Sequence, residues 1–88
     1  MGIFKDHLTE LLSLPKEILL NLPQIILTGR KEISIENYKS IIEYSDTTIR
    51  INTSSGVLLI VGNSLTLKHM TTEYITIVGG ITKLEFLG

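Results

Sequence analysis

The chain contains no cysteine, and this absence removes two of the ways in which a small domain can be stabilised. Disulfide bonds cannot form, and a zinc site would need carboxylates or a second chain, because the two histidines, His7 and His69, lie far apart in the sequence. At 88 residues the chain makes one domain, close to the smallest size that a single hydrophobic core can hold. Packing or self-association must therefore stabilise the fold.

An excess of charge of one sign is also missing. Eight Lys and Arg residues oppose nine Asp and Glu residues, and no basic cluster is present, so we expect no binding to nucleic acid. No apolar run reaches the roughly 18–20 residues that cross a bilayer. Asp6, His7 and Glu10 interrupt the N-terminus where a signal peptide would be apolar. These features predict a cytoplasmic protein.

The first 23 residues have the pattern of a short helical segment. One helical stripe collects the apolar side chains of this region, namely Ile3, Phe4, Leu8, Leu11 and Leu12. Pro15 suits the first turn of a second short helix, and Pro23 ends it. We expect residues 1–23 to pack on the rest of the domain through this stripe, with docking on a partner or a membrane surface as the alternative.

From Gln24 onward the apolar period changes to two, which predicts a β domain over residues 24–88. Turn signals recur every eight or nine residues at Gly29, Asn37, Ser45-Asp46, Ser54-Ser55-Gly56, Gly62-Asn63, Thr71-Thr72 and Gly79-Gly80. Gly-Asn and Gly-Gly favour two-residue hairpin turns, so consecutive strands should pair antiparallel. The fold class is therefore mainly β with a short N-terminal helical segment.

The strand arrangement has several solutions on the sequence alone. We find no residue-level repeat between segments, which favours an antiparallel meander, a roll or a small barrel over the alternative of a β-solenoid. Ile33 and Ile35 share one strand face, and Ile49 and Ile51 share another. These alternating faces should form the core, with polar residues on the opposite side.

Two strands are apolar on both faces, around residues 57–61 and 74–78. A strand of this kind needs cover on both sides, and one short helix cannot easily supply it for both strands. We therefore predict a homo-oligomer, or binding to another protein, through an interaction surface. Its residues are Val57, Leu59, Val61, Tyr74, Thr76 and Val78, together with Phe4, Leu8 and Leu11 of the helical stripe.

No pattern indicates catalysis, a cofactor or a metal. Hydroxyl side chains are so abundant that a chance neighbour for His69 carries no information. The acidic residues Glu32, Glu36 and Glu43 alternate with apolar positions, as on a solvent face, and no glycine cluster opens a helix as a phosphate loop would. We expect no catalytic, cofactor-binding or metal-binding residues and no enzyme. The alternative function is a roll or barrel that binds a small apolar ligand.

Several motifs together resemble one known family. They are the two-proline stretch Leu14-Pro15-Lys16-Glu17 to Leu22-Pro23, the triplet Ile35-Glu36-Asn37, the segment Ile49-Arg50-Ile51-Asn52-Thr53 with Gly56, and the step from Gly79 to Ile81. Over about residues 14–86 the chain resembles the YabP/YqfC family of small sporulation proteins from endospore-forming Firmicutes.

The resemblance implies a non-enzymatic protein of the mother cell that takes part in building the spore envelope or coat. It implies no catalytic residues. It also implies a possible partner, since a YqfD-like membrane protein commonly accompanies this family. The implied location is the mother-cell cytoplasm, with peripheral attachment to the outer forespore membrane as an alternative.

Overall fold

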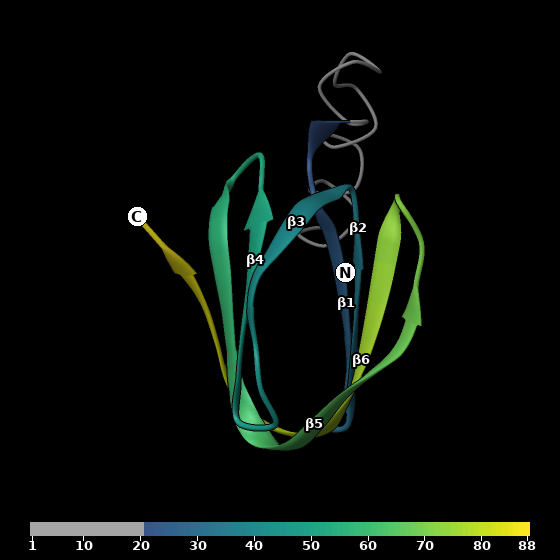
Figure 1. The fold of residues 1–88 in the computed structure, drawn as a ribbon, viewed down its shortest axis with the longest axis vertical. Coiled ribbons are helices and arrows are strands. Elements are labelled where there is room, and N and C mark those ends of the chain that lie inside the picture. The colour runs from purple at the N-terminus through teal and green to yellow at the C-terminus, as the bar shows by residue number, and fades with distance from the viewer. Residues whose placement is uncertain (1–20) are drawn as a thin grey trace, which may run out of the picture.

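In the computed structural model, residues 21–88 are described, and they form one antiparallel β sheet (Figure 1). The six strands are β1 (Gln24–Thr28), β2 (Glu32–Glu36), β3 (Tyr38–Tyr44), β4 (Thr48–Thr53), β5 (Gly56–Met70) and β6 (Tyr74–Leu87). Their order across the sheet is β1-β2-β6-β5-β4-β3. Strands β5 and β6 are 15 and 14 residues long, and their length lets one sheet serve as two layers.

Each long strand contributes its two halves to different layers. Layer A consists of β1, β2, residues 74–78 of β6 and residues 66–70 of β5. Layer B consists of β3, β4, residues 57–61 of β5 and residues 83–87 of β6. Figure 1 shows the result as a U, with the bent β5–β6 ribbon at its base. Both layers turn one face toward the inside of this U.

The core lies between the two layers. Its most buried side chains are Ile33, Ile35, Ile49, Ile51, Leu58, Ile60, Leu65, Ile75 and Ile77. Except for Leu65, which lies at the bend of β5, they come from the central strands of both layers and follow the period of two that the sequence predicted for β structure. Burial of branched aliphatic residues from both layers is the main stabilising contribution to the fold.

The two layers repeat one arrangement of strands. A hairpin (β1–β2 or β3–β4) pairs through its second strand with the first half of a long strand (β6 or β5). In this correspondence Ile33 and Ile35 match Ile49 and Ile51, and Ile75 and Ile77 match Leu58 and Ile60. The sequence shows no residue-level repeat, and the likeness between the layers lies in the strand arrangement and in this small set of aliphatic core positions.

Tyrosines close one side of the U. The backbone N–H of Leu67 in layer A donates to Tyr44 Oη in layer B at 3.4 Å. Tyr38 Oη donates to the carbonyl oxygen of Thr71 at 2.6 Å, and Tyr38 is buried. The edge strand β3 thus lies beside the edge formed by residues 66–70. By the strand order, β1 and residues 83–87 form the two edges of the opposite side.

Close approach of two backbones produces the bend in the ribbon. A Cβ atom on Gly62 would lie 2.1 Å from the carbonyl oxygen of Gly80. A Cβ atom on Gly79, which has a φ of +146°, would lie 2.8 Å from the carbonyl oxygen of Ser64. No side chain fits in either place, so glycine permits the crossing of β5 and β6.

These observations sort the expectations from sequence. The mainly β, antiparallel fold is confirmed, and five of the seven turn signals fall at or beside strand ends. The hairpin turns expected at Gly62-Asn63 and Gly79-Gly80 are wrong, because these residues lie inside β5 and β6. A meander is also wrong, since β2 pairs with β6, and β1 and β3 end the sheet of residues 21–88, so it is not a closed barrel or a solenoid. The helical segment predicted for residues 1–23 falls almost entirely outside the described residues.

The bend predicts unequal effects of adding a methyl group to neighbouring glycines. Gly62→Ala should lower the free energy of unfolding by about 2–3 kcal/mol, because the methyl group would overlap a main-chain oxygen that cannot rotate away. Gly80→Ala is the matched control, since its Cβ atom would find its nearest neighbour at 3.7 Å, and its cost should stay below about 1 kcal/mol. Urea denaturation measures both values. Equal destabilisation by the two substitutions would contradict this account of the bend.

Candidate interaction surface

The charged side chains of the described residues form isolated ion pairs rather than a reactive cluster. Glu32 pairs with Lys68 at 3.4 Å, and Glu43 pairs with Arg50. Within residues 21–88 no group of three or more His, Cys, Asp or Glu side chains is placed to hold a metal ion. No helix of these residues has the length and apolar character to cross a membrane.

The first half of the predicted interaction surface lies on the outer face of layer B. Val57, Leu59 and Val61 point away from the core, because they alternate with the buried Leu58 and Ile60. Leu59 nevertheless retains only 9% of its surface exposed, and Val57 and Val61 are half-buried. Leu59 lies directly opposite Arg50 and Glu85 on the two neighbouring strands.

The second half lies on the outer face of layer A. Thr76 is 6% exposed, and its hydroxyl shares a hydrogen bond with Ser34 Oγ at 3.2 Å. Val78 is half-buried, and Tyr74 is 38% exposed at the start of β6. Of these three side chains only Tyr74 offers a substantial contact area to another molecule.

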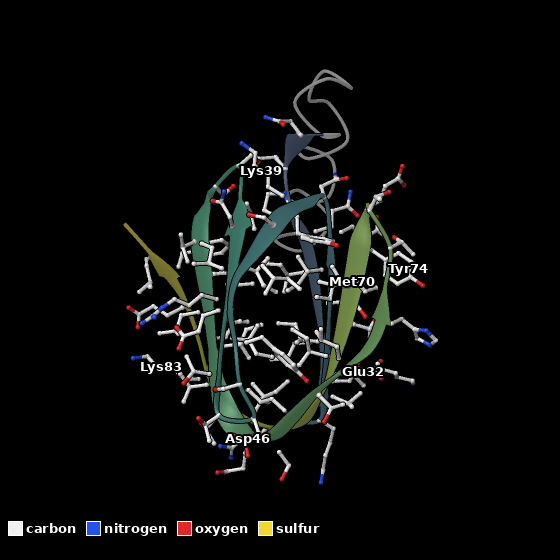
Figure 2. The ribbon with its side chains drawn as sticks, viewed as in Figure 1. Glu32, Lys39, Asp46, Met70, Tyr74 and Lys83 are labelled. Carbon is white, nitrogen blue, oxygen red and sulfur yellow. The ribbon has the colours of Figure 1, made fainter. Side chains whose placement is uncertain are left out.

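The structure does not bring the two halves together. They lie on the outer faces of opposite layers, and Figure 2 shows Lys83 of layer B and Tyr74 of layer A on opposite sides of the molecule. Phe4, Leu8 and Leu11, the remaining residues predicted for this surface, lie outside the described residues. A single partner could not cover both halves at once.

Three other exposed apolar side chains, Leu27, Leu84 and Phe86, lie at edge strands on the face that each layer turns inward. Leu84 and Phe86 lie directly opposite the core residues Ile60 and Leu58, yet they are 37% and 46% exposed. In β1, Leu27 lies opposite Ile33 of β2 and is 47% exposed. These three side chains extend the core face beyond the area that the facing layer covers, and they border the side of the U that no tyrosine closes.

Sequence reasoning did not single out these three residues. The signal was present in the alternation of Lys83, Leu84, Glu85 and Phe86, which marks a strand with one apolar face. Residues 57–61 and 74–78 were predicted instead, because both segments are apolar on both strand faces. Density along a strand does not reveal whether that strand is central or at an edge, and only an edge leaves its apolar face open.

Burial of Leu59 on an outer face leads to a prediction about stability. Leu59→Ala should lower the free energy of unfolding by about 2 kcal/mol, since it empties a covered position. Ile26→Ala is the matched control on the outer face of layer A, where Ile26 is 64% exposed, and it should cost less than about 1 kcal/mol. Chemical denaturation compares the two. A larger loss at Ile26 would show that Leu59 does not contribute as a buried packing position.

Comparison with known proteins agrees with the family resemblance noted from the sequence. The chain is 29% identical over 83 residues to a protein of Bacillus subtilis (strain 168) described as "Uncharacterized protein YqfC", and the match covers 94% of this chain and 89% of that protein. The family description "YabP family" matches residues 21–88, which is the whole of the two-layered sheet described above. The chain therefore belongs to the YabP family.

Proposed function

We propose that this protein is a non-enzymatic structural or assembly factor that acts in the mother cell during formation of the spore envelope or coat. Membership of the YabP family is the observation that carries the proposal, since the family resemblance implies a role in sporulation. The proposed mode of action is contact with other proteins, including copies of itself and a membrane protein of the YqfD type. The proposed location is the mother-cell cytoplasm or the outer forespore membrane.

The charge pattern and the edge strands support a role through contacts. Two of the acidic residues that alternate with apolar positions, Glu32 and Glu43, are engaged in partly exposed ion pairs. Apolar side chains are exposed at strand edges, where a partner can add main-chain hydrogen bonds as well as apolar contact. A small apolar ligand between the layers is less favoured, because it would have to displace the side chains that fill this space (Figure 2).

Deletion of the gene in its spore-forming host tests the role. We expect the deletion strain to grow normally but to yield fewer heat-resistant spores, with a defective coat or envelope in thin-section electron micrographs. A wild-type copy at a second locus should restore the count, and the same copy with an early stop codon is the control. Normal numbers of resistant spores with intact layers would refute the proposed role.

A further inference from the structure

The described residues leave four strand edges without a strand partner, and the last part of β6 differs from the other three. Residues 83–87 pair with residues 57–61 of β5 in unbroken register. The edge strand β3 has two register irregularities, and residues 66–70 have one, with the N–H of Leu67 already bonded to Tyr44. The edge strand β1 is regular but carries no charge. Residues 83–87 therefore form the one edge that is both regular and charged.

The hydrogen-bond pattern fixes which main-chain groups of this edge face outward. The N–H of Gly62 donates to the carbonyl oxygen of Thr47 at 3.0 Å, so even-numbered residues in this half of β5 point toward β4. Residues 57, 59 and 61 must then point toward β6, where they pair with residues 87, 85 and 83. Because alternate residues of a strand bond to opposite sides, Leu84 and Phe86 direct their N–H and C=O groups away from the sheet.

The side chains of the same edge alternate in character. Lys83 and Glu85 lie on the outer face and form an ion pair at 3.1 Å, with side chains 55% and 46% exposed. Leu84 and Phe86 lie on the core face and remain partly uncovered. The edge thus presents outward main-chain groups, an apolar inner row and a plus-minus pair on its outer row.

We propose that a second copy of this chain docks on residues 83–87 of β6, with the two strands antiparallel about a two-fold axis at Leu84. In this register each Lys83 lies opposite the partner's Glu85, and each Leu84 lies opposite the partner's Leu84. The outward N–H and C=O groups of the two Leu84 residues then form two interchain hydrogen bonds. Phe86 lies beyond this central pair, beside the partner's Thr82, which is the unpaired residue at the register shift of β6.

The charges select this register from its neighbours. A two-fold axis at Lys83 would place that lysine against its own copy, and an axis at Glu85 would place two carboxylates together, both of which are unfavourable. Only the axis at Leu84 pairs opposite charges while it keeps the apolar rows of both copies on one face. The four strands of layer B in each copy then form one continuous sheet of eight. This inference rests on the proposed function, in which the protein acts through protein contacts, and it names one partner and its surface.

Charge reversal tests the register. Lys83→Glu or Glu85→Lys alone should weaken dimerisation by at least about tenfold, because each change occurs twice across the axis and creates like-charge pairs. The double variant Lys83→Glu/Glu85→Lys should restore wild-type dimerisation. Sedimentation velocity of the full chain between about 1 and about 100 µM measures the dissociation constant over a suitable range. Glu73→Lys makes the same charge change as Glu85→Lys, but at the exposed β5–β6 turn. It is the control and should have no effect on dimerisation. A monomer throughout this range, or single variants that dimerise as well as wild type, would overturn the proposal.

A cross-link provides an independent measurement of position. The chain has no cysteine, so Leu84→Cys introduces the one thiol of each chain. At a two-fold axis on a hydrogen-bonded pair the two Cα atoms lie about 5.5 Å apart, within disulfide range. Mild oxidation should therefore convert this variant to a covalent dimer, while the control Ile26→Cys on the β1 edge should remain monomeric.

The outcomes separate this inference from the proposed function. Cross-linking at Ile26→Cys but not at Leu84→Cys would assign association to β1 and overturn the proposal. A monomer that cross-links at neither position would also overturn it. The spore count of the deletion strain judges the role in sporulation whatever the oligomeric state proves to be.

Discussion

The architecture depends on the contact of two main chains where β5 and β6 cross. At Gly62 the neighbouring backbone passes so closely that even a methyl group would overlap the carbonyl oxygen of Gly80. This contact lets the long ribbon turn from one layer into the other without breaking. Every other feature follows from it: the halves of each strand join different layers, the layers face one another, and the aliphatic core fills the space between them.

The bend also determines which strands become edges. Each layer has two edge segments. One is a short strand, β1 or β3, and the other is the second half of a long strand of the ribbon, β5 or β6. Tyr38 and Tyr44 bind across one pair of edges, whereas Leu27, Leu84 and Phe86 remain exposed at the other. Tyrosine hydrogen bonds thus join the layers on one side of the molecule, while the other side presents these three apolar side chains. The proposed role through protein contacts builds on this difference.

Much of the fold could be predicted from local pattern. The alternation of Ile33, Ile35, Ile49 and Ile51 identified four fully buried positions, and Asn37, with a φ of 62°, was recognised as a turn residue. Gly62 and Gly79 were misread as hairpin turns for a physical reason. A glycine that supplies a turn and a glycine that admits a neighbouring backbone look the same in sequence, and only the distant strand distinguishes them. The interaction surface was harder to predict, because nothing along β5 itself shows that Leu59 lies between two neighbouring strands and is buried.

The pairing of β2 with β6 has a consequence for how the chain folds during its synthesis. Layer B needs strands β3, β4 and the start of β5, which are adjacent in sequence, whereas layer A joins the first hairpin to the last strand. During translation the β1–β2 hairpin therefore emerges from the ribosome long before its partner exists. Non-local pairing of this kind is slow, and the apolar face of the hairpin stays unprotected until residues 74–78 have also left the ribosome. The nascent chain should thus be open to misassembly from the emergence of the first hairpin until that of β6.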